Sequence, residues 1–374
     1  MNSKIWLSSP HMSGFEEEFI QKAFSTNYVA PIGSNITNFE NELESYLGDN
    51  SFVTAVTSGT SAIHLALLLL GVSVGDEVIC QTKTFVASVN PVRYVGAKPV
   101  LIDSETDTWN MCPKLLEQAL EERVKSGNRP KAIIVINLYG MPYKVNEIHE
   151  IAKAYNVPII EDSAEALGSM YNNQKCGTFG DLSILSFNGN KIITTSAGGA
   201  IISRNKEQKN ESLYLATQAK DNTIEYNHTR IGYNYRMSNI SAGIGLGQLK
   251  VLNNYVELRR RNFEYYYNTL NHISEITFLI EPEGFYSNRW LSCILFKDNE
   301  TRDSVRKLLE KNNIESRPSW KPMHLQPIYK NCDSYLNGVS NKLYKCGLCL
   351  PSGSNLKVED LERIVKIIKS YFEA

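Results

Sequence analysis

Short apolar runs alternate with longer amphipathic stretches between about residue 50 and residue 205. The strand-like runs are rich in β-branched residues and lack a clean polar/apolar alternation, which is typical of strands covered on both faces. They span 52–56, 77–80, 99–102, 132–136, 157–160, 182–187 and 199–203. Helical spacing lies between them, over 61–70, 113–125 and 143–155. This alternation predicts an α/β domain with a largely parallel sheet.

Beyond about residue 250 the pattern changes. Residues 251–270 form a charged, aromatic-rich stretch with helical spacing, short strand-like runs follow, and a last helix is predicted over 358–372. The chain has 374 residues, which exceeds one ordinary domain. We therefore predict a large domain over 1–250 and a smaller C-terminal α+β domain over 251–374, with the boundary inside or beside a long helix.

The composition limits the class of partner. Hydrophobic residues make up 42% of the chain, charged residues 21%, and the formal net charge is -1. These values indicate neither disorder nor a nucleic-acid surface, so a small-molecule partner is expected. The start lacks an export signal, and the longest apolar run, 65–70, is far shorter than the roughly 20 residues that span a bilayer. We expect a cytoplasmic protein without a membrane partner.

The cysteines do not indicate a metal site. Seven cysteines is an odd number in a long chain, which favours free thiols over a disulfide framework. Cys346 and Cys349 have C-x-x-C spacing, but no second pair or histidine cluster completes a zinc site. We predict no metal, and we interpret the pair as buried thiols in a strand.

Asp162 and Lys191 carry the chemistry that the sequence predicts. Asp162 ends an apolar run, so it should project from the carboxyl end of a strand, where open α/β sheets bind their ligands. Lys191 follows the run 182–187 in a polar, glycine-containing loop. An amine that forms an imine and a carboxylate that keeps a pyridine nitrogen protonated are what pyridoxal phosphate needs from a protein. Taken singly, Asp162 fits a helix cap equally well, and Lys191 a solvated charge.

Residues near these two suit a phosphate and an aromatic ring. Ser58, Gly59 and Thr60 join the first strand to a helix, which directs N–H groups, hydroxyls and the positive helix end toward an anion. Ser186 adds a hydroxyl from the lysine loop. The tripeptide also serves as an ordinary N-cap. Phe85 follows a strand and is placed to stack on a pyridine ring, although a single aromatic there is more often part of the core.

In this order, these residues resemble the DegT-type family of nucleotide-sugar aminotransferases, which have the fold-type-I architecture of pyridoxal phosphate enzymes. The similarity covers nearly the whole chain. Its motifs are Pro10-His-Met, Asn27-Tyr-Val-Ala-Pro-Ile-Gly33, Ser58-Gly-Thr60, Glu161-Asp-Ser-Ala-Glu165, the stretch from Ser186 to Thr195, Gly232-Tyr-Asn-Tyr-Arg-Met-Ser238 and Arg317-Pro-Ser-Trp-Lys-Pro-Met-His324. The resemblance implies an α/β large domain with a mostly parallel mixed sheet and a smaller C-terminal α+β domain.

The resemblance also implies a role for each matching residue. Lys191 is then the lysine that bonds pyridoxal 5'-phosphate, and Asp162 is the partner of its ring nitrogen. The other cofactor-binding residues are then Ser58, Gly59, Thr60, Phe85, Glu165, Ser186, Asn188 and Asn234. Asn234 corresponds to an asparagine that reaches the phosphate from the neighbouring subunit, which implies a homodimer with shared active sites. Glu165 stands where relatives carry Gln, His or Glu, and its protonation is left open.

The motifs around Lys191 and Arg317 look most like those of enzymes that aminate C4 of UDP-2-acetamido-4-keto-2,6-dideoxyhexoses, as in bacillosamine-type surface sugars. The implied substrates are a UDP-4-keto-sugar and L-glutamate. Candidate sugar-nucleotide residues are Asn288, Arg289, Trp290, Arg317, Trp320 and His324, since Arg can grip a diphosphate and Trp can stack on a sugar or base. Interdomain packing explains the two tryptophans equally well. The alternative functions are a related dehydratase, whose lysine is replaced by histidine, and a non-catalytic cofactor-binding regulator.

Overall fold

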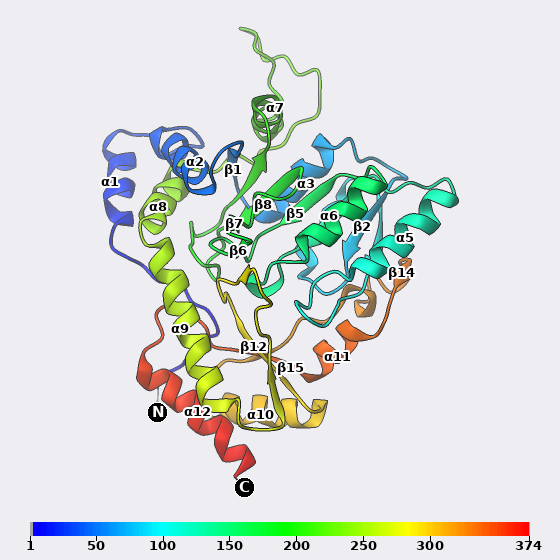
Figure 1. The fold of residues 1–374 in the computed structure, drawn as a ribbon. Coiled ribbons are helices and arrows are strands. Elements are labelled where there is room, and N and C mark those ends of the chain that lie inside the picture. The colour runs from blue at the N-terminus through cyan, green and yellow to red at the C-terminus, as the bar shows by residue number, and fades with distance from the viewer. Residues whose placement is uncertain (1–2, 374) are drawn as a thin grey trace.

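The centre of the protein is a mixed sheet whose strands are mostly parallel. In the computed structural model, which describes residues 3–373, this sheet contains eight strands in the order β1-β9-β8-β5-β4-β2-β3-β14 (Figure 1). They are β1 (Phe52–Val56), β2 (Glu77–Gln81), β3 (Lys98–Ile102), β4 (Ala132–Ile136), β5 (Ile159–Asp162), β8 (Leu182–Ser186), β9 (Gly199–Ser203) and β14 (Ser334–Tyr335). The neighbours from β14 to β8 are parallel, whereas β9 runs antiparallel to both β8 and β1.

Helices cover both faces of this sheet, and the side chains of β4 show why. Ile133 and Val135 pack in one core with the helices on one face, whereas Ile134 and Ile136 belong to a second core on the other. The period of two along a strand makes this division. The helices of the first face are α5 (Pro113–Lys125) and α6 (Val145–Ala154). Helix α3 (Gly59–Leu69) packs against both α4 (Asn90–Tyr94) and α7 (Lys206–Ala216). Helix α8 (Asn239–Leu249) packs against both α1 (Glu16–Ser25) and α2 (Ser34–Leu47), and α2 contacts β1.

All seven strands predicted from the apolar runs are present, with ends that shift by a few residues. The largest shift is in β5, which begins at Ile159 and ends at Asp162 rather than spanning 157–160. Pro158 has no N–H group to donate to a ladder, so the strand begins after it. This shift makes Asp162 the last residue of its strand.

The C-terminal part forms a smaller antiparallel sheet with its own core. Its order is β10-β12-β15-β13, formed by β10 (Ile276–Phe278), β12 (Ser292–Phe296), β15 (Gly347–Leu350) and β13 (Arg317–Pro318). Apolar residues of this sheet pack with α10 (Asn299–Lys311) and α12 (Val358–Phe372). The long helix α9 (Leu252–Leu270) runs along both parts of the molecule and contributes Tyr255 to the large core and Tyr266 to the small one (Figure 1). Strand β14 lies beyond the predicted boundary at residue 250, yet it belongs to the large sheet. The division into two domains at that boundary therefore stays a prediction.

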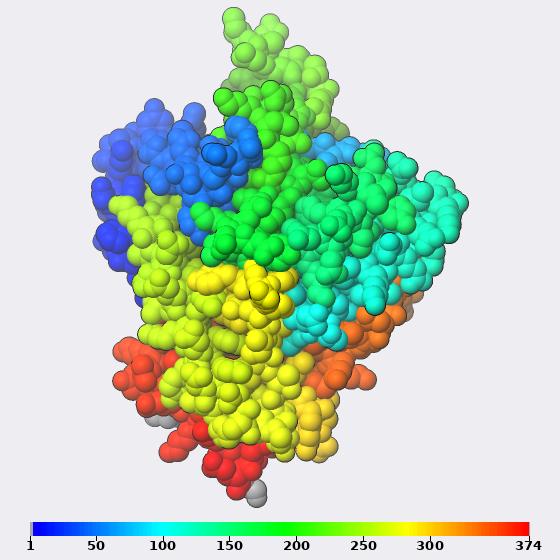
Figure 2. Space-filling view, in the orientation of Figure 1, coloured from blue at the N-terminus to red at the C-terminus, as the bar shows by residue number. Residues whose placement is uncertain are grey.

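Three smaller features complete the fold. A hairpin-like sheet contains β11 (Phe285–Tyr286), β6 (Met170–Tyr171) and β7 (Gln174–Lys175), and single 3-10 turns lie at Val86–Ser88, Leu138–Gly140 and Met323–Leu325. The chain after α7 projects from the top of the molecule (Figures 1 and 2). Among the helices of residues 3–373, none combines the length and apolar character needed to traverse a bilayer.

The two cysteines of the C-x-x-C sequence lie in different elements. Cys346 is the last residue of α11 (Val339–Cys346), and Cys349 lies in β15. The prediction of two thiols in one strand was therefore wrong for Cys346, because the chain turns from helix to strand between them. Both are buried, and the Sγ atom of Cys349 lies 3.3 Å from that of Cys293 on the adjacent strand β12.

Candidate active site

The carboxyl ends of the central strands open into a cavity of about 310 Å³. Asp162 ends β5, and Lys191 lies in the loop after β8, the strand next to β5. Because parallel strands present their carboxyl ends at the same edge of a sheet, both side chains reach this cavity. The predicted residues that line it are Ser58, Gly59, Thr60, Phe85, Asp162, Glu165, Ser186, Asn188, Lys191, Trp290 and Trp320.

Asp162 is a buried carboxylate with hydrogen-bond donors on both oxygens. Its Oδ2 accepts from the Ser88 hydroxyl at 2.7 Å, and its Oδ1 accepts from the backbone N–H of Ala164 at 3.1 Å. No helix follows β5 directly, so Asp162 is not a helix cap. Burial raises the pKa of Asp162, and the two hydrogen bonds and the charge of Lys191 oppose this. A protonated ring nitrogen would give this carboxylate the cationic partner that burial demands.

Lys191 is held between a carboxylate and an aromatic face. Its Nζ lies 3.5 Å from Oε1 of Glu165 and 4.1 Å from the centre of the Trp290 ring. A hydrogen bond within the loop holds its backbone, because the N–H of Lys191 donates to the Asn188 carbonyl at 2.9 Å. The side chain is 13% exposed, so Lys191 is not a solvated surface charge. Its amine is placed to reach a ligand in the cavity.

Glu165 completes the polar floor of the cavity. Its Oε2 accepts from the backbone N–H of Tyr139 at 2.7 Å, and its other oxygen faces Lys191. Burial raises the pKa of Glu165 from 4.5 to about 7, against the opposing effects of Lys191 and Tyr139. Near neutral pH this residue therefore exchanges a proton readily, and the carboxyl group can serve as either donor or acceptor.

The first turn of α3 supplies an anion site at one end of the cavity. Ser58 is the N-cap, and its Oγ accepts from the Ser61 N–H at 3.1 Å. The N–H groups of Gly59 and Thr60 lie in the first turn of the helix, where there are no intrahelical acceptors for them. A side chain at Gly59 would meet Ser186 Cβ at 3.1 Å, so glycine allows the β8 end to approach this turn closely. These residues fit a phosphate. Together with Asp162 and Lys191, they fit pyridoxal phosphate.

Aromatic side chains form the wall of the cavity. Phe85 is 53% exposed, so it does not belong to the core, and its ring centre lies 5.4 Å from that of Trp320. Trp320 packs in turn on Tyr139, 5.2 Å between ring centres, and on Trp290, 6.0 Å. Trp290 is buried and donates from Nε1 to the Asn190 carbonyl at 2.7 Å. Both tryptophans therefore pack between the two parts of the molecule and also border the cavity.

Two of the sugar-nucleotide candidates are occupied by structural contacts. The Asn288 amide donates to the carbonyls of Glu165 and Leu167 at 2.8 and 2.9 Å, which holds the loop after β5. His324 bonds through Nδ1 to Thr82 at 2.8 Å and through Nε2 to Asn341 at 2.9 Å. Neither residue lines the cavity.

The two arginine candidates point away from the cavity. The guanidinium of Arg289 lies 3.6 Å from the centre of the Phe263 ring and donates to the Leu279 carbonyl at 2.8 Å. Arg317, on β13, pairs with Glu315 at 2.9 Å on the molecular surface. Within one chain, the expectation that these side chains grip a diphosphate in the cavity does not match their positions. A strand or turn sets which side an arginine faces, and the motif does not encode this.

Asn234 also lies outside the cavity. It is exposed, on the segment that returns from the projecting chain after α7 to α8. Its predicted contact is with the phosphate of a neighbouring subunit, and an exposed position is compatible with that prediction.

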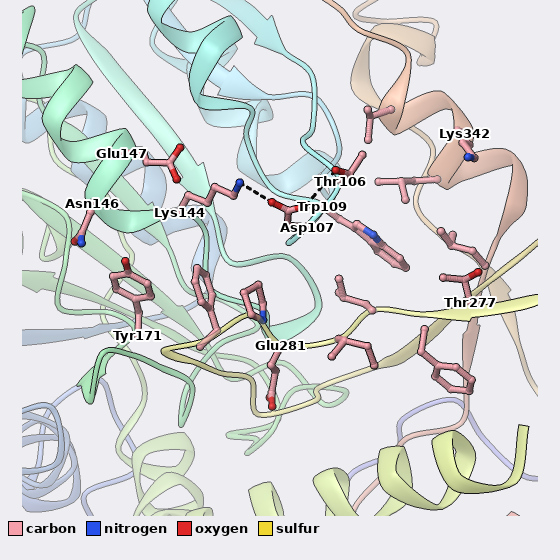
Figure 3. Close-up of a pocket in the computed structure, with 18 of the residues that line it drawn as sticks. Thr106, Asp107, Trp109, Lys144, Asn146, Glu147, Tyr171, Thr277, Glu281 and Lys342 are labelled. Atoms are coloured by element: carbon pink, nitrogen blue, oxygen red, sulfur yellow. Dashed lines mark hydrogen bonds and ion pairs between the residues drawn. The ribbon is translucent and has the colours of Figure 1, made fainter. Parts of the chain in front are cut away.

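A larger hollow of about 960 Å³ lies elsewhere, between α6 and the β10–β11 region (Figure 3). Its polar rim includes Lys144, which pairs with Asp107 at 2.7 Å, while Trp109 forms part of its apolar floor. It contains none of the predicted cofactor residues. The chemistry of the side chains therefore identifies the smaller cavity as the candidate active site.

Three neighbours of the candidate site were not predicted from the sequence. Ser88, which bonds Asp162, and Tyr139, whose backbone bonds Glu165, belong to loops with no distinctive motif. Arg259 on α9 is buried and donates to the backbone carbonyl of Lys191 at 3.3 Å. A signal for Arg259 did exist, because its helical spacing places it on the apolar stripe of α9 with Tyr255 and Phe263.

Comparison with known proteins gives one consistent result. The sequence profile of the DegT/DnrJ/EryC1/StrS aminotransferase family matches residues 10–369. EpsN of Bacillus subtilis (strain 168), named as a pyridoxal phosphate-dependent aminotransferase, is 46% identical over 100% of this chain and 97% of its own. GDP-perosamine synthase of Escherichia coli O157:H7 is 36% identical, covering 97% of each chain. A solved DegT DnrJ EryC1 StrS aminotransferase from Brucella abortus matches with a TM-score of 0.90 at 30% identity, covering 96% of this chain and 95% of its own.

Proposed function

Because the chain belongs to the DegT/DnrJ/EryC1/StrS aminotransferase family, we propose that it transfers the amino group of L-glutamate to C4 of a UDP-2-acetamido-4-keto-2,6-dideoxyhexose in surface-sugar biosynthesis. The chain is a pyridoxal phosphate-dependent sugar aminotransferase. The observation that carries the proposal is the convergence of Lys191, Asp162 and the first turn of α3 on one cavity. A cytoplasmic location, predicted from the sequence, is part of the proposal.

The residues of the cavity divide the work. Pyridoxal phosphate, when bound, supplies an aldehyde for amines and a ring that accepts electrons from the carbon beside them. The N–H groups of Gly59 and Thr60 would hold its phosphate, and Asp162 would keep its ring nitrogen protonated. Lys191 would hold its aldehyde, and the freed amine would move a proton at the substrate carbon. Trp290 covers this amine and shields it from water.

The sugar nucleotide is assigned from the motifs around Lys191 and Arg317, which look most like those of UDP-4-keto-sugar aminotransferases. Trp320 and Phe85 border the open side of the cavity, where a sugar ring can stack. A GDP-linked 4-keto sugar is the second candidate, because GDP-perosamine synthase of Escherichia coli O157:H7 is 36% identical to this chain.

A homodimer with shared active sites completes the proposal. Large apolar side chains are exposed in the N-terminal segment, at Trp6, Phe15, Phe24, Tyr28 and Ile32, and on the projecting segment, at Ile224, Tyr226 and Ile231. Large apolar side chains exposed on these two segments are compatible with an interface. A twofold dimer that buried them would bring the exposed Asn234 of each subunit toward the other.

The test of the reaction uses purified protein reconstituted with pyridoxal phosphate. Borohydride should attach the cofactor to Lys191, and glutamate with a UDP-4-keto-sugar should give a product whose C4 amine and configuration are read by NMR. Loss of water without gain of an amine would indicate the dehydratase alternative. An absorbance spectrum that glutamate leaves unchanged would indicate a regulator. A parallel reaction with a GDP-4-keto sugar ranks the two nucleotides, and Lys191→Ala is the inactive control.

The test of the dimer is complementation between two inactive variants. Lys191→Ala and Asn234→Ala subunits, mixed after mild dissociation, should form heterodimers with one intact site and recover about one quarter of wild-type activity. No recovery, in samples shown by light scattering to have exchanged subunits, would contradict shared sites.

A further inference from the structure

Arg259 is a buried cation whose described partners are all neutral. Its side chain is 1% exposed, yet Nη1 donates to the carbonyls of Trp290 and Ser352 at 2.7 and 3.3 Å. Its Nη2 donates to the Ser8 hydroxyl and to the carbonyl of Lys191 at 3.1 and 3.3 Å. Burial lowers the pKa of Arg259 to about 9, so it stays protonated at neutral pH. A buried charge without an opposite charge beside it lowers the stability of the folded protein. A cation in this position therefore calls for a role other than stability.

The four acceptors come from four segments that are distant in the sequence. They are the N-terminal arm, the lysine loop, the strand entry at Trp290 and the chain after β15. The same segments are cross-linked at Asn190, whose carbonyl accepts from the Ser8 hydroxyl and from Trp290 Nε1, each at 2.7 Å. The carbonyls of Asn190 and Lys191 are therefore both fixed, and the guanidinium of Arg259 hydrogen-bonds directly to all four segments.

We propose that Arg259 is a positioning residue for amino transfer: its guanidinium fork fixes the Lys191 loop against Trp290, a role that rests on the function proposed above. One arm of the fork holds Trp290 and the other holds the lysine loop, so the fork sets the distance of 4.1 Å between the Lys191 amine and the Trp290 ring. A lysine at this position would keep the charge. Its single ammonium head cannot reach both pairs of acceptors, because it lacks the planar fork.

The experiment compares Arg259→Lys with Arg260→Lys in the full-length protein. Arg260 is the matched control, since it is the next residue of α9 and its guanidinium binds Glu281 and the Ser287 carbonyl instead of the lysine loop. Hydrogen exchange by mass spectrometry reports on residues 187–195, with and without pyridoxal phosphate. Stopped-flow absorbance of the holoenzyme with glutamate separates the maximal rate of amino transfer from the half-saturating glutamate concentration.

For Arg259→Lys we expect exchange in residues 187–195 to rise about tenfold. The maximal rate should fall about a hundredfold, with the half-saturating concentration changed less than about threefold, because a shift of about 1 Å at the amine costs rate more than binding. Arg260→Lys should match wild type in both readouts. Exchange and rate in Arg259→Lys equal to those of Arg260→Lys would overturn the proposal.

A second variant keeps the test decisive if Arg259→Lys does not fold. Ser8→Ala removes one acceptor of the fork at a half-buried position of the N-terminal arm, and it should change both readouts in the same direction by about threefold. Unchanged exchange and rate in Ser8→Ala would then overturn the proposal. Wild-type protein that transfers no amino group would refute the proposed function instead, while the exchange comparison would still decide whether Arg259 fixes the loop.

Discussion

Replacing Glu165 with glutamine should remove a pH-dependent part of the protein's stability. Glu165 is almost wholly buried, and its pKa is raised from 4.5 to about 7, chiefly by burial. Glutamine has nearly the same shape, keeps an acceptor for the Tyr139 N–H and does not titrate. The contact with Lys191 is lost as well, but because it favours the ionised form of Glu165, its effect is already contained in the pKa of about 7.

The direction of the effect follows from proton binding. Glu165 binds its proton more tightly in the folded protein than in the unfolded chain. Its contribution to the free energy of unfolding is therefore full below about pH 4.5 and is lost as the pH rises through 7. The whole shift corresponds to about 3 kcal/mol, of which about 2 kcal/mol disappears between pH 5.5 and pH 8.5.

Thermal unfolding of the cofactor-free protein measures this effect. The melting temperature of Glu165→Gln minus that of wild type should increase by a few degrees between pH 5.5 and pH 8.5. Glu310→Gln, on the exposed face of α10, is the control and should give a difference that does not depend on pH. A constant difference for Glu165→Gln at pH 5.5, 7 and 8.5 would refute the reasoning, because it would mean that Glu165 titrates alike in the folded and unfolded states.

Three further predictions use other parts of the structure. Gly199→Ala should weaken cofactor binding about tenfold or more in a fluorescence titration, since the added Cβ would lie 2.4 Å from the Gly59 nitrogen. The control is Gly189→Ala, which should bind the cofactor normally because its added Cβ would have its nearest contact at 3.6 Å. Asp162→Asn should lower turnover about a hundredfold at a melting temperature that does not fall, because an amide cannot stabilise a protonated ring nitrogen but removes a buried charge; wild-type turnover would exclude that role. Ellman's reagent should label one thiol rapidly in the native protein and none in Cys332→Ser, since Cys332 is half-buried and the other six cysteines are buried.

The sequence could predict that the residues of the candidate active site meet in one cavity, because strand order determines where they lie. Asp162 ends a strand of the large sheet, and Gly59 and Lys191 each follow one. Strands that point the same way bring their carboxyl ends to one edge whatever the lengths of the intervening helices. An error of two residues in the bounds of β5 did not matter, since Asp162 remained at the end of the strand.

The positions of the sugar-nucleotide candidates relative to the cavity could not be predicted from the sequence, because they depend on side-chain direction. Arg289 has a positive φ of 52°, and its side chain turns onto Phe263 in the smaller core of the C-terminal part. Arg317 lies on a two-residue strand, where a shift of one position exchanges the two faces. A sequence motif gives the type of residue at such positions, but not the direction in which its side chain points.

Lys83 has the same kind of buried, unpaired charge as Arg259. Its ammonium donates to the Ser319 hydroxyl at 3.1 Å and to the Trp320 carbonyl at 3.0 Å, and burial lowers its pKa to about 8. Apolar residues often replace buried charges with no loss of stability, so stability alone does not explain either cation. Each cation instead fixes the position of a backbone segment, because an N–H donor holds a carbonyl at a set distance and angle. Apolar contacts impose no such geometry. The bond from Lys83 to the Trp320 carbonyl therefore joins the two segments that carry Phe85 and Trp320, whose ring centres lie 5.4 Å apart at the cavity.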